Sequence, residues 1–234
     1  MKPSDRVFVA LDTTDTAEAC MLAEKLQGRV GGIKLGKEFF TANGPQGVRE
    51  VSALGAPVFL DLKFHDIPNT VAGAVRAALP LNPFMLNLHA SGGAAMIAAA
   101  AKAADEGEGS RPMMLAVTVL TSLGDGDVNA MGVTGTAREQ VVRLAKMAQA
   151  NGMDGVVCSA HEVMTLRGAC GKNFKLIVPG IRPSWSSTDD QKRVVTPAEA
   201  VAMGADYLVI GRPITKAADP IEAVERITEE LDAG

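Results

Sequence analysis

The stretch from Arg6 to Gly36 reads RVFVALDTTDTAEACMLAEKLQGRVGGIKLG, and it holds one complete unit of a pattern that recurs along the chain. It opens with a short apolar run that ends at Asp12, and apolar residues then follow at helical spacing from Thr16 to Gln27. A second apolar run, GGIKLG, closes the unit. Thr13 or Asp15 would start the helix, because short polar side chains cap helix N-termini. The stretch therefore predicts a strand, a helix and a second strand.

The same alternation continues to the end of the chain. Continuous apolar runs bounded by Gly, Pro and Asp are typical of strands buried on both faces, which occur in parallel sheets. The further runs of this kind are Pro57–Lys63, Phe84–Ala90, Met113–Ser122, Asp154–Ala160, Lys175–Arg182 and Asp206–Arg212. Segments with helical spacing lie between several of them, at Thr70–Ala78, Gly93–Ala104, Thr136–Ala150 and Pro220–Leu231. Together with the first unit, these runs predict eight strands that alternate with helices.

This alternation in one chain of 234 residues favours an α/β fold, a single (β/α)8 TIM barrel with parallel strands. A doubly wound open sheet is the alternative. That fold usually has a glycine-rich turn after its first strand, and residues 12–15 contain no glycine. No linker, low-complexity tail or charge block divides the chain. We expect residues 1–234 to form one catalytic barrel domain.

Composition and charge narrow the classes of partner. The chain has 23 Lys+Arg against 27 Asp+Glu, a formal net charge of −4, which disfavours binding of a nucleic-acid polymer or an anionic membrane. The longest apolar stretch, Ala94–Ala101, is too short to cross a bilayer, and no secretory signal is visible. The widely spaced Cys20, Cys158 and Cys170 predict no disulfide framework. We expect a cytoplasmic protein.

Charged residues stand where the predicted strands end. In a (β/α)8 barrel the C-terminal ends of all strands open on one face, and catalytic residues lie there. The charged residues expected at this mouth are Asp12, Lys34, Asp61, Lys63 and, in the following loop, Asp66. For any one of them a structural ion pair is an equally good interpretation. For all of them together a catalytic network is the better one, because such networks shift pKa values where chemistry occurs.

A second group of residues indicates an anion site. Gly211-Arg212 follows the eighth predicted strand, where many barrels bind phosphate, and Arg182 ends the seventh. A solvated Gly-Arg turn is the alternative. The polar segment 183–193 contains the only tryptophan, Trp185, and its interpretations as a lid over the mouth or as an ordinary surface loop both stay open.

The histidines show no metal-ligand pattern. His65, His89 and His161 are scattered, so the sequence predicts no metal site. His89 stands at a strand end, where a hydrogen-bonded structural histidine is a better interpretation than a base.

The segment Asp61–Thr70 reads DLKFHDIPNT and resembles the signature of the orotidine 5′-phosphate decarboxylase family, Asp-x-Lys-x-x-Asp-Ile-Pro-Asn-Thr. The likeness extends through the whole chain and is greatest to the compact bacterial form of the family. Its other segments are Ala10–Asp12, Lys34–Phe40, Gly44-Pro45, Leu120–Ser122, Pro179–Pro183, Gln191 and Ile210–Ile214.

The resemblance implies conversion of orotidine 5′-phosphate to UMP and CO2, the last step of de novo pyrimidine synthesis, without a cofactor. It implies that Lys63 protonates C6 of the pyrimidine. Asp61 and Asp66 would hold this lysine in a charged network that Lys34 completes. The charge argument agrees, because a lysine between carboxylates keeps its charged form and is a good proton donor.

The resemblance also implies a set of substrate-binding residues: Asp12, Lys34, Asp61, Ile67, Thr70, Thr121, Ser122, Arg182, Gln191, Gly211 and Arg212. The first two would bind ribose hydroxyls, the Thr121-Ser122 pair would meet the pyrimidine, and the last four would hold the phosphate and the closing loop. In the family's homodimer, Asp66, Ile67 and Thr70 would reach into the partner's site.

Loss of CO2 from C6 leaves an in-plane electron pair that the ring cannot delocalise directly. Most decarboxylases supply an electron sink such as PLP or thiamine diphosphate, and nothing in the sequence indicates one. Fixed charge and a positioned acid are the remaining means of catalysis.

Three other activities stay open. A magnesium-dependent sugar-phosphate decarboxylase or lyase shares the Asp-x-Lys-x-x-Asp core, but it takes a carboxylate from the second strand, where this chain has Ile33-Lys34. A Schiff-base aldolase that uses Lys63 is disfavoured, because a lysine held charged is a poor nucleophile. The third, a phosphoribosyl-binding module without chemistry, is disfavoured by the intact set of Asp61, Lys63 and Asp66.

Overall fold

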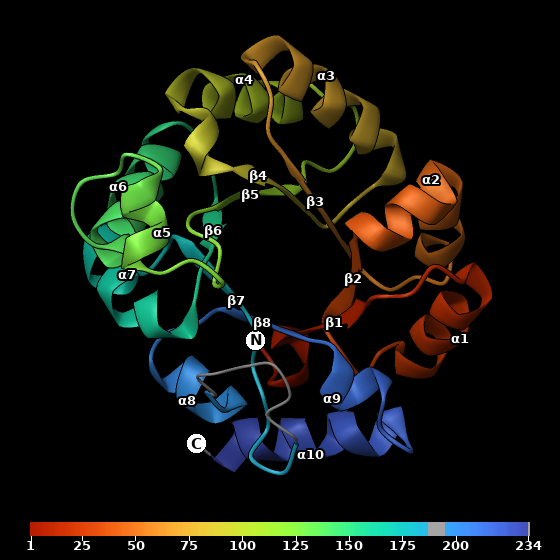
Figure 1. Cartoon of the computed structure of the whole chain (residues 1–234). Helices are drawn as coiled ribbons and strands as arrows, with labels where there is room; N and C mark the ends of the chain where they lie inside the picture. Colours follow the sequence, from red (N-terminus) through yellow and green to blue (C-terminus); the bar gives the residue numbers. More distant parts are fainter. Residues whose placement is uncertain (187–194, 234) are drawn as a thin grey trace.

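The computed structural model describes residues 1–186 and 195–233, and it shows a closed barrel of parallel strands surrounded by helices (Figure 1). Each strand pairs with the next, and β8 closes the barrel against β1. The strands are β1 (Val7–Leu11), β2 (Gly32–Gly36), β3 (Val58–Phe64), β4 (Met85–His89), β5 (Met113–Val117), β6 (Gly155–Val157), β7 (Lys175–Pro179) and β8 (Tyr207–Ile210). The predicted (β/α)8 barrel is confirmed.

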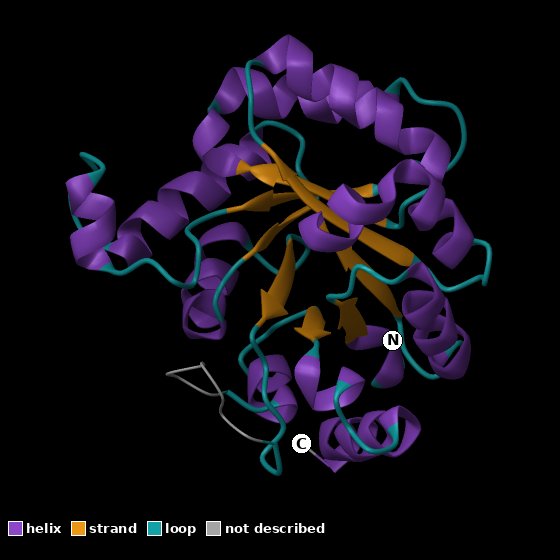
Figure 2. Cartoon of the chain, turned by 45° about the vertical axis from the view of Figure 1, so that its right-hand side comes forward, coloured by secondary structure: helices purple, strands orange, loops and turns teal. Residues whose placement is uncertain are grey.

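The helices lie outside the strands and enclose them on all sides (Figure 2). Their bounds are α1 (Thr16–Leu26), α2 (Lys37–Ser52), α3 (Pro68–Ala78), α4 (Ala94–Asp105), α5 (Asp125–Ala130), α6 (Ala137–Ala150), α7 (Val163–Cys170), α8 (Pro197–Ala202), α9 (Arg212–Thr215) and α10 (Pro220–Ala233). Short 3-10 turns occupy Ser4–Arg6, Leu79–Leu81, Ala90–Gly92 and Ala160–Glu162. Within the described ranges, none of these helices has the length and apolar character needed to span a membrane.

Helix starts follow the polar signals in the sequence. The Asp15 carboxylate accepts hydrogen bonds from the backbone N–H groups of Ala17 and Glu18, which identifies Asp15 as the cap of α1. At α10, Asp219 Oδ1 accepts the N–H of Ile221 at 2.9 Å. These short side chains satisfy N–H groups that have no partner inside the helix.

The core has two layers because strand side chains alternate between the barrel interior and the surrounding helices. The interior cluster consists of Phe8, Ala10, Phe59, Met85, Leu115, Ile177, Tyr207 and Val209. A larger cluster between strands and helices contains the other parity, for example Val9, Leu60 and Leu86. A closed, filled barrel of this kind fixes the positions of all strand ends, and therefore of any side chain at the mouth.

Several strands end earlier than the apolar runs predict, β5 and β7 among them. β5 stops at Val117 rather than Ser122, since its neighbour β6 stops at Val157 and offers no further backbone partner. β7 stops at Pro179, and the next residue, Gly180, turns the chain with a φ of 77°. Residues beyond these ends belong to the loops that surround the mouth.

Candidate active site

Four charged side chains form a continuous chain of ion pairs at the C-terminal mouth of the barrel. Lys63 Nζ lies 2.5 Å from Asp61 Oδ1, and Lys34 Nζ lies 3.5 Å from Asp61 Oδ2. Lys34 Nζ also lies 3.4 Å from Asp12 Oδ1. Asp12 follows β1, Lys34 belongs to β2, and the other two belong to β3. The structure therefore brings together four of the residues that the sequence places at the mouth.

The sheet register explains this convergence. Ala10 pairs with Lys34, and Gly36 pairs with Asp61, so the C-terminal ends of β1, β2 and β3 lie side by side. Gly36 also leaves room for the ion pairs. A Cβ at this position would lie 3.2 Å from Lys34 Nζ, closer than a side chain normally packs.

Asp61 is a buried anion held between two cations. Burial alone would raise its pKa, but Lys34, Lys63 and the hydrogen bonds from Lys63 and Asn87 outweigh burial and hold the pKa of this carboxyl below its ordinary value. The carboxylate is therefore charged at neutral pH.

Asn87, in β4, completes the network and is missing from the residues expected at the mouth. Its Nδ2 donates to Asp61 Oδ1 at 2.6 Å, and its Oδ1 accepts the backbone N–H of Lys63 at 2.7 Å. One sequence signal was available: Asn87 is a polar residue inside an otherwise apolar predicted strand, and it has the same parity as the interior residue Met85.

A cavity of about 210 Å³ opens beside these charges. Its charged lining residues are Lys34, Asp61 and Lys63. The remaining lining residues are mostly apolar: Phe59, Val117, Val119, Leu120, Thr121, Val157, Cys158, Pro179 and Val209. A lining that combines a few charged groups with apolar side chains suits a flat ring that carries an ionic group.

Of the two neighbouring residues Thr121 and Ser122 in the loop after β5, one lines this cavity and the other does not. Both Thr121 and Ser122 are exposed in a turn beyond the end of β5. Thr121 lines the cavity, whereas Ser122 is not among its lining residues. The two residues were expected to end the strand, and the early stop of β5 at Val117 separates them from the sheet.

Asp66, Ile67 and Thr70 lie outside the cavity of their own chain. All three are exposed where the loop after β3 leads into α3, and Ile67 is 67% exposed. Asp66 Oδ1 accepts the N–H of Ile67 at 2.7 Å, while the ion pair of Lys63 within the described residues is with Asp61. A single chain therefore does not bring Asp66 to the lysine.

The predicted anion site lies next to the mouth on β7 and β8. Arg182 is buried, and its backbone N–H donates to the carbonyl of Val195. Gly211 follows β8 and lies close to Asp12. A Cβ added at Gly211 would be 3.8 Å from Asp12 Oδ2. Arg212 is the first residue of α9.

The proposed lid is described only in part. Gln191 and most of the segment 183–193 lie outside the described residues. Trp185, in the described part, packs against the outer core, and the guanidinium carbon of Arg226 lies 4.2 Å from the centre of its ring. The indole therefore contacts helix α10 and can report on this region by fluorescence.

The histidines of the mouth form a pair. The ring centres of His65 and His89 lie 5.6 Å apart. Burial, together with His65, Lys37 and Lys63, lowers the pKa of His89 to about 4. Across the ranges that the structure covers, no group of three or more His, Cys, Asp or Glu side chains has the arrangement of a metal site.

Comparison with known proteins identifies the family. A family model described as "Orotidine 5'-phosphate decarboxylase / HUMPS family" matches residues 5–227. The chain belongs to this family. The resemblance to the family that the segment DLKFHDIPNT indicates is thereby confirmed, and it extends over nearly the full length of the chain.

Relatives within the orotidine 5′-phosphate decarboxylase / HUMPS family are similar over almost the whole chain. An orotidine 5′-phosphate decarboxylase from Rhodospirillum rubrum is 58% identical over 231 residues, covering 96% of this chain and 93% of the relative. One from Saccharophagus degradans is 52% identical over 230 residues, covering 98% of this chain and 96% of the relative. The crystal structure of the enzyme from Lactobacillus acidophilus has a TM-score of 0.86 at 38% identity, covering 97% of this chain and 98% of that one.

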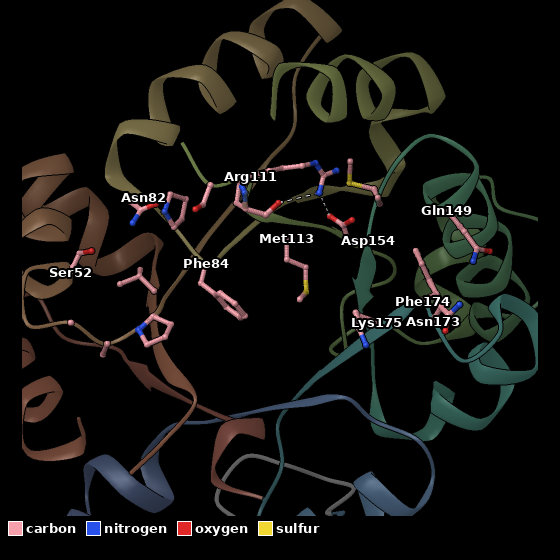
Figure 3. A pocket seen from close by; sticks show the side chains of 18 residues that line it. Ser52, Asn82, Phe84, Arg111, Met113, Gln149, Asp154, Asn173, Phe174 and Lys175 are labelled. Atoms are coloured by element: carbon pink, nitrogen blue, oxygen red, sulfur yellow. Dashed lines mark hydrogen bonds and ion pairs between the residues drawn. The ribbon is translucent and has the colours of Figure 1, made fainter. Parts of the chain in front are cut away.

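A larger hollow, about 890 Å³, lies at the opposite end of the barrel, where β3 to β7 begin (Figure 3). Phe84 and Met113 point toward its centre, and Arg111 lies at its edge with Asp154 as a hydrogen-bonded partner. The segment Asp61–Thr70, which carries the resemblance to the family, contributes no residue to this hollow. The smaller cavity at the mouth is therefore the candidate active site.

Proposed function

We propose that the chain decarboxylates orotidine 5′-phosphate to UMP and CO2, the last step of de novo pyrimidine synthesis. The observation that carries the proposal is the ion-pair chain of Asp12, Lys34, Asp61 and Lys63, the last three of which line a ring-sized cavity. Family membership points to the same activity. Residues 1–234 would act as one catalytic domain, and the cytoplasm is the compartment we propose for it.

In this proposal the substrate lies across the mouth, from the charged residues at the ends of β1, β2 and β3 to the anion site at the ends of β7 and β8. The pyrimidine would lie in the cavity, with C6 toward Asp61 and Lys63 and with Thr121 and Ser122 at its rim. Asp12 and Lys34 would bind ribose hydroxyls. The phosphate would be bound by Arg182, Gly211 and Arg212 at the ends of β7 and β8, and by Gln191. Binding energy at this distant phosphate can be used to close loops and to orient the ring.

The chemical step needs a proton at C6. The bond between C6 and the carboxylate breaks, CO2 leaves, and the electron pair stays at C6 in the plane of the ring. The Lys63 ammonium donates a proton to that position and later regains one from water. Asp61 holds this ammonium in place, and fixed charge with a positioned acid takes the part that a cofactor plays in other decarboxylases.

We also propose a homodimer in which Asp66, Ile67 and Thr70 complete the partner's site. Their exposure, and the ion pair that Lys63 makes with Asp61 rather than with Asp66 in the described part of the chain, support this arrangement. A mixture of Lys63→Ala and Asp66→Asn proteins, unfolded and refolded together, tests it. Because half of randomly paired dimers are mixed and each mixed dimer holds one intact site, activity should recover to roughly a quarter of wild type. No recovery, with exchange verified, would leave Asp66 serving its own subunit.

The activity itself is tested by the fall in ultraviolet absorbance of orotidine 5′-phosphate on adding purified protein. Turnover that survives EDTA supports the proposal. Loss of turnover on chelation, with rescue by magnesium, would favour a metal-dependent sugar-phosphate enzyme, although Lys34 occupies the strand position from which that class takes a carboxylate. Trapping of Lys63 by borohydride would favour the aldolase, and UMP binding without turnover would favour a binding module.

A further inference from the structure

Asn87 is fully buried in the middle of β4, and the proposed reaction gives it no role. Met85 belongs to the cluster inside the barrel, whereas Leu86 and Leu88 belong to the outer cluster. Asn87 therefore points into the barrel, next to Met85 and nearer the mouth. An amide in such a place is costly unless both of its ends are hydrogen-bonded.

Both ends of the amide bind the catalytic pair. Nδ2 donates to the Asp61 carboxylate, and Oδ1 accepts the Lys63 backbone N–H. The partners fix the orientation of the amide, because a carboxylate can only accept and a backbone N–H can only donate. Asn87 thus joins the side chain of one catalytic residue to the backbone of the other.

The backbone that Asn87 holds is unusual. Lys63 has a φ of 53°, in the left-handed region that residues other than glycine rarely adopt. The register of β3 against β4 shifts between Leu60 and Phe64, so Lys63 lies where the regular strand pairing is interrupted. The Asn87 carbonyl supplies the acceptor for its N–H at this point.

We propose that Asn87 is a positioning residue that fixes the Lys63 ammonium and the Asp61 carboxylate in the geometry of proton transfer. The inference rests on the proposed decarboxylation and deepens it. Asn87 Nδ2 and Lys63 Nζ bind the same oxygen of Asp61, which leaves the second oxygen to Lys34. Without the amide, the carboxylate can rotate, and the Lys63 backbone can relax toward an ordinary strand.

Asn87→Leu tests the proposal by removing both hydrogen bonds while keeping a side chain that branches at Cγ. We expect kcat to fall about 100-fold, the scale associated with a misplacement of about 1 Å. The dissociation constant of UMP should change little, because Asn87 does not line the cavity. Thr118→Val is the matched control. Thr118 is also buried near the mouth, but its hydroxyl donates to the carbonyl of Val157 rather than to the catalytic pair, so kcat should stay near wild type.

Asn87→Asp provides a second readout that a purely structural role would not change. It keeps an acceptor for the Lys63 N–H but places a second carboxylate against Asp61. The charged or titratable groups around this pair are Lys34 from β2, Lys63 from β3 and His89 from β4. Two adjacent carboxylates share a proton, so the acid limb of the kcat profile should move to higher pH.

The outcomes separate this inference from the proposed function. Absence of turnover by the wild-type protein would refute the decarboxylation itself. Wild-type turnover, with unchanged kcat and pH profile in both variants, would refute positioning by Asn87. Parallel loss of UMP binding and kcat would also refute it. Failure of both variants to fold, judged by circular dichroism, would overturn it by showing that the amide serves the β3–β4 pairing instead.

Discussion

Both ends of the barrel contain ion pairs, but the carboxylates at the two ends have different additional hydrogen-bond partners. At the end where the strands begin, Arg111 Nη1 lies 2.5 Å from Asp154 Oδ2, and Arg167 Nη2 lies 2.7 Å from Asp206 Oδ2. At the mouth, Lys34 and Lys63 both reach Asp61. Distances of this kind do not distinguish a structural network from a catalytic one.

The remaining hydrogen bonds do distinguish them. Asp154 also accepts the backbone N–H of Met114 at 2.7 Å, and Asp206 accepts that of Leu176 at 2.9 Å. Each of these carboxylates therefore accepts a hydrogen bond from the backbone near the start of a strand, β5 for Asp154 and β7 for Asp206. Asp61 instead receives two ammonium groups and one amide beside a cavity. Carboxylates that bind strand backbone serve stability, whereas Asp61, whose partners are the side chains of Lys34, Lys63 and Asn87, is the better candidate for chemistry.

Lys63→Ala tests the mouth with the largest expected effect. We expect kcat for orotidine 5′-phosphate to fall by at least about 1,000-fold, because the variant has no acid at C6. UMP binding should persist, since the proposed role of Lys63 lies in the chemical step. Steady-state kinetics and UMP titration measure the two quantities. Near-normal turnover would remove Lys63 from the mechanism.

Arg212→Ala tests the part of the mouth assigned to phosphate. A charge-assisted hydrogen bond to phosphate contributes about 1.5–3 kcal/mol, so UMP should bind roughly 10- to 100-fold more weakly. Binding of the nucleoside uridine should change much less, and it is the internal control. Equal losses for nucleotide and nucleoside would show that Arg212 does not bind the phosphate.

The mouth could largely be predicted from the sequence. Its prediction depends on the alternation of apolar runs with helical segments and on charged residues in or near the ends of those runs. The apolar runs predict the barrel, and the position of Asp12, Lys34 and Asp61 at strand ends predicts their convergence at one mouth. Both inferences need only the fact that parallel strands in a barrel end on the same face.

The rest depends on contacts that no local pattern encodes. Strict alternation predicts an ordinary extended backbone at Lys63, whereas its φ is 53°. In that conformation the Lys63 backbone N–H donates to Asn87, 24 residues away in the chain. The stop of β5 at Val117 likewise depends on the short length of β6, which the apolar run Asp154–Ala160 overstates. Pairing between strands decided both features.

Asp206→Ala tests the opposite end, where the expected effect is on stability. Removal of the carboxylate leaves Arg167 and the N–H of Leu176 without this partner, which should lower the free energy of unfolding by about 1–3 kcal/mol. The kcat measured well below the melting temperature should match wild type. Urea unfolding and steady-state kinetics provide the test. A loss of kcat with unchanged stability would contradict the contrast between the two ends.

His89→Gln sharpens the comparison with the smallest expected effect. Burial, followed by His65, Lys37 and Lys63, lowers the pKa of the His89 imidazole from 6.5 to about 4. As pH falls from 6.5 toward 4, the unfolded chain therefore binds a proton at this residue before the folded chain does. Stability is complete above 6.5 and is lost progressively through this interval. The variant lacks the group, so its melting temperature should fall less than that of wild type between about pH 7 and about pH 5.

The half-exposed position of His89 limits the size of this difference, because solvent screens the charges around it. We expect the difference to be smaller than the loss caused by Asp206→Ala. His65→Gln is the matched variant, since it removes one neighbour that lowers the pKa of His89 but keeps the imidazole itself. Its acid sensitivity should lie between those of wild type and His89→Gln. Wild type, His89→Gln and His65→Gln could instead lose stability equally on acidification. That result would show that the surroundings of His89 do not lower its pKa. The electrostatic difference between the two ends of the barrel would then be confined to Asp61, Lys34 and Lys63.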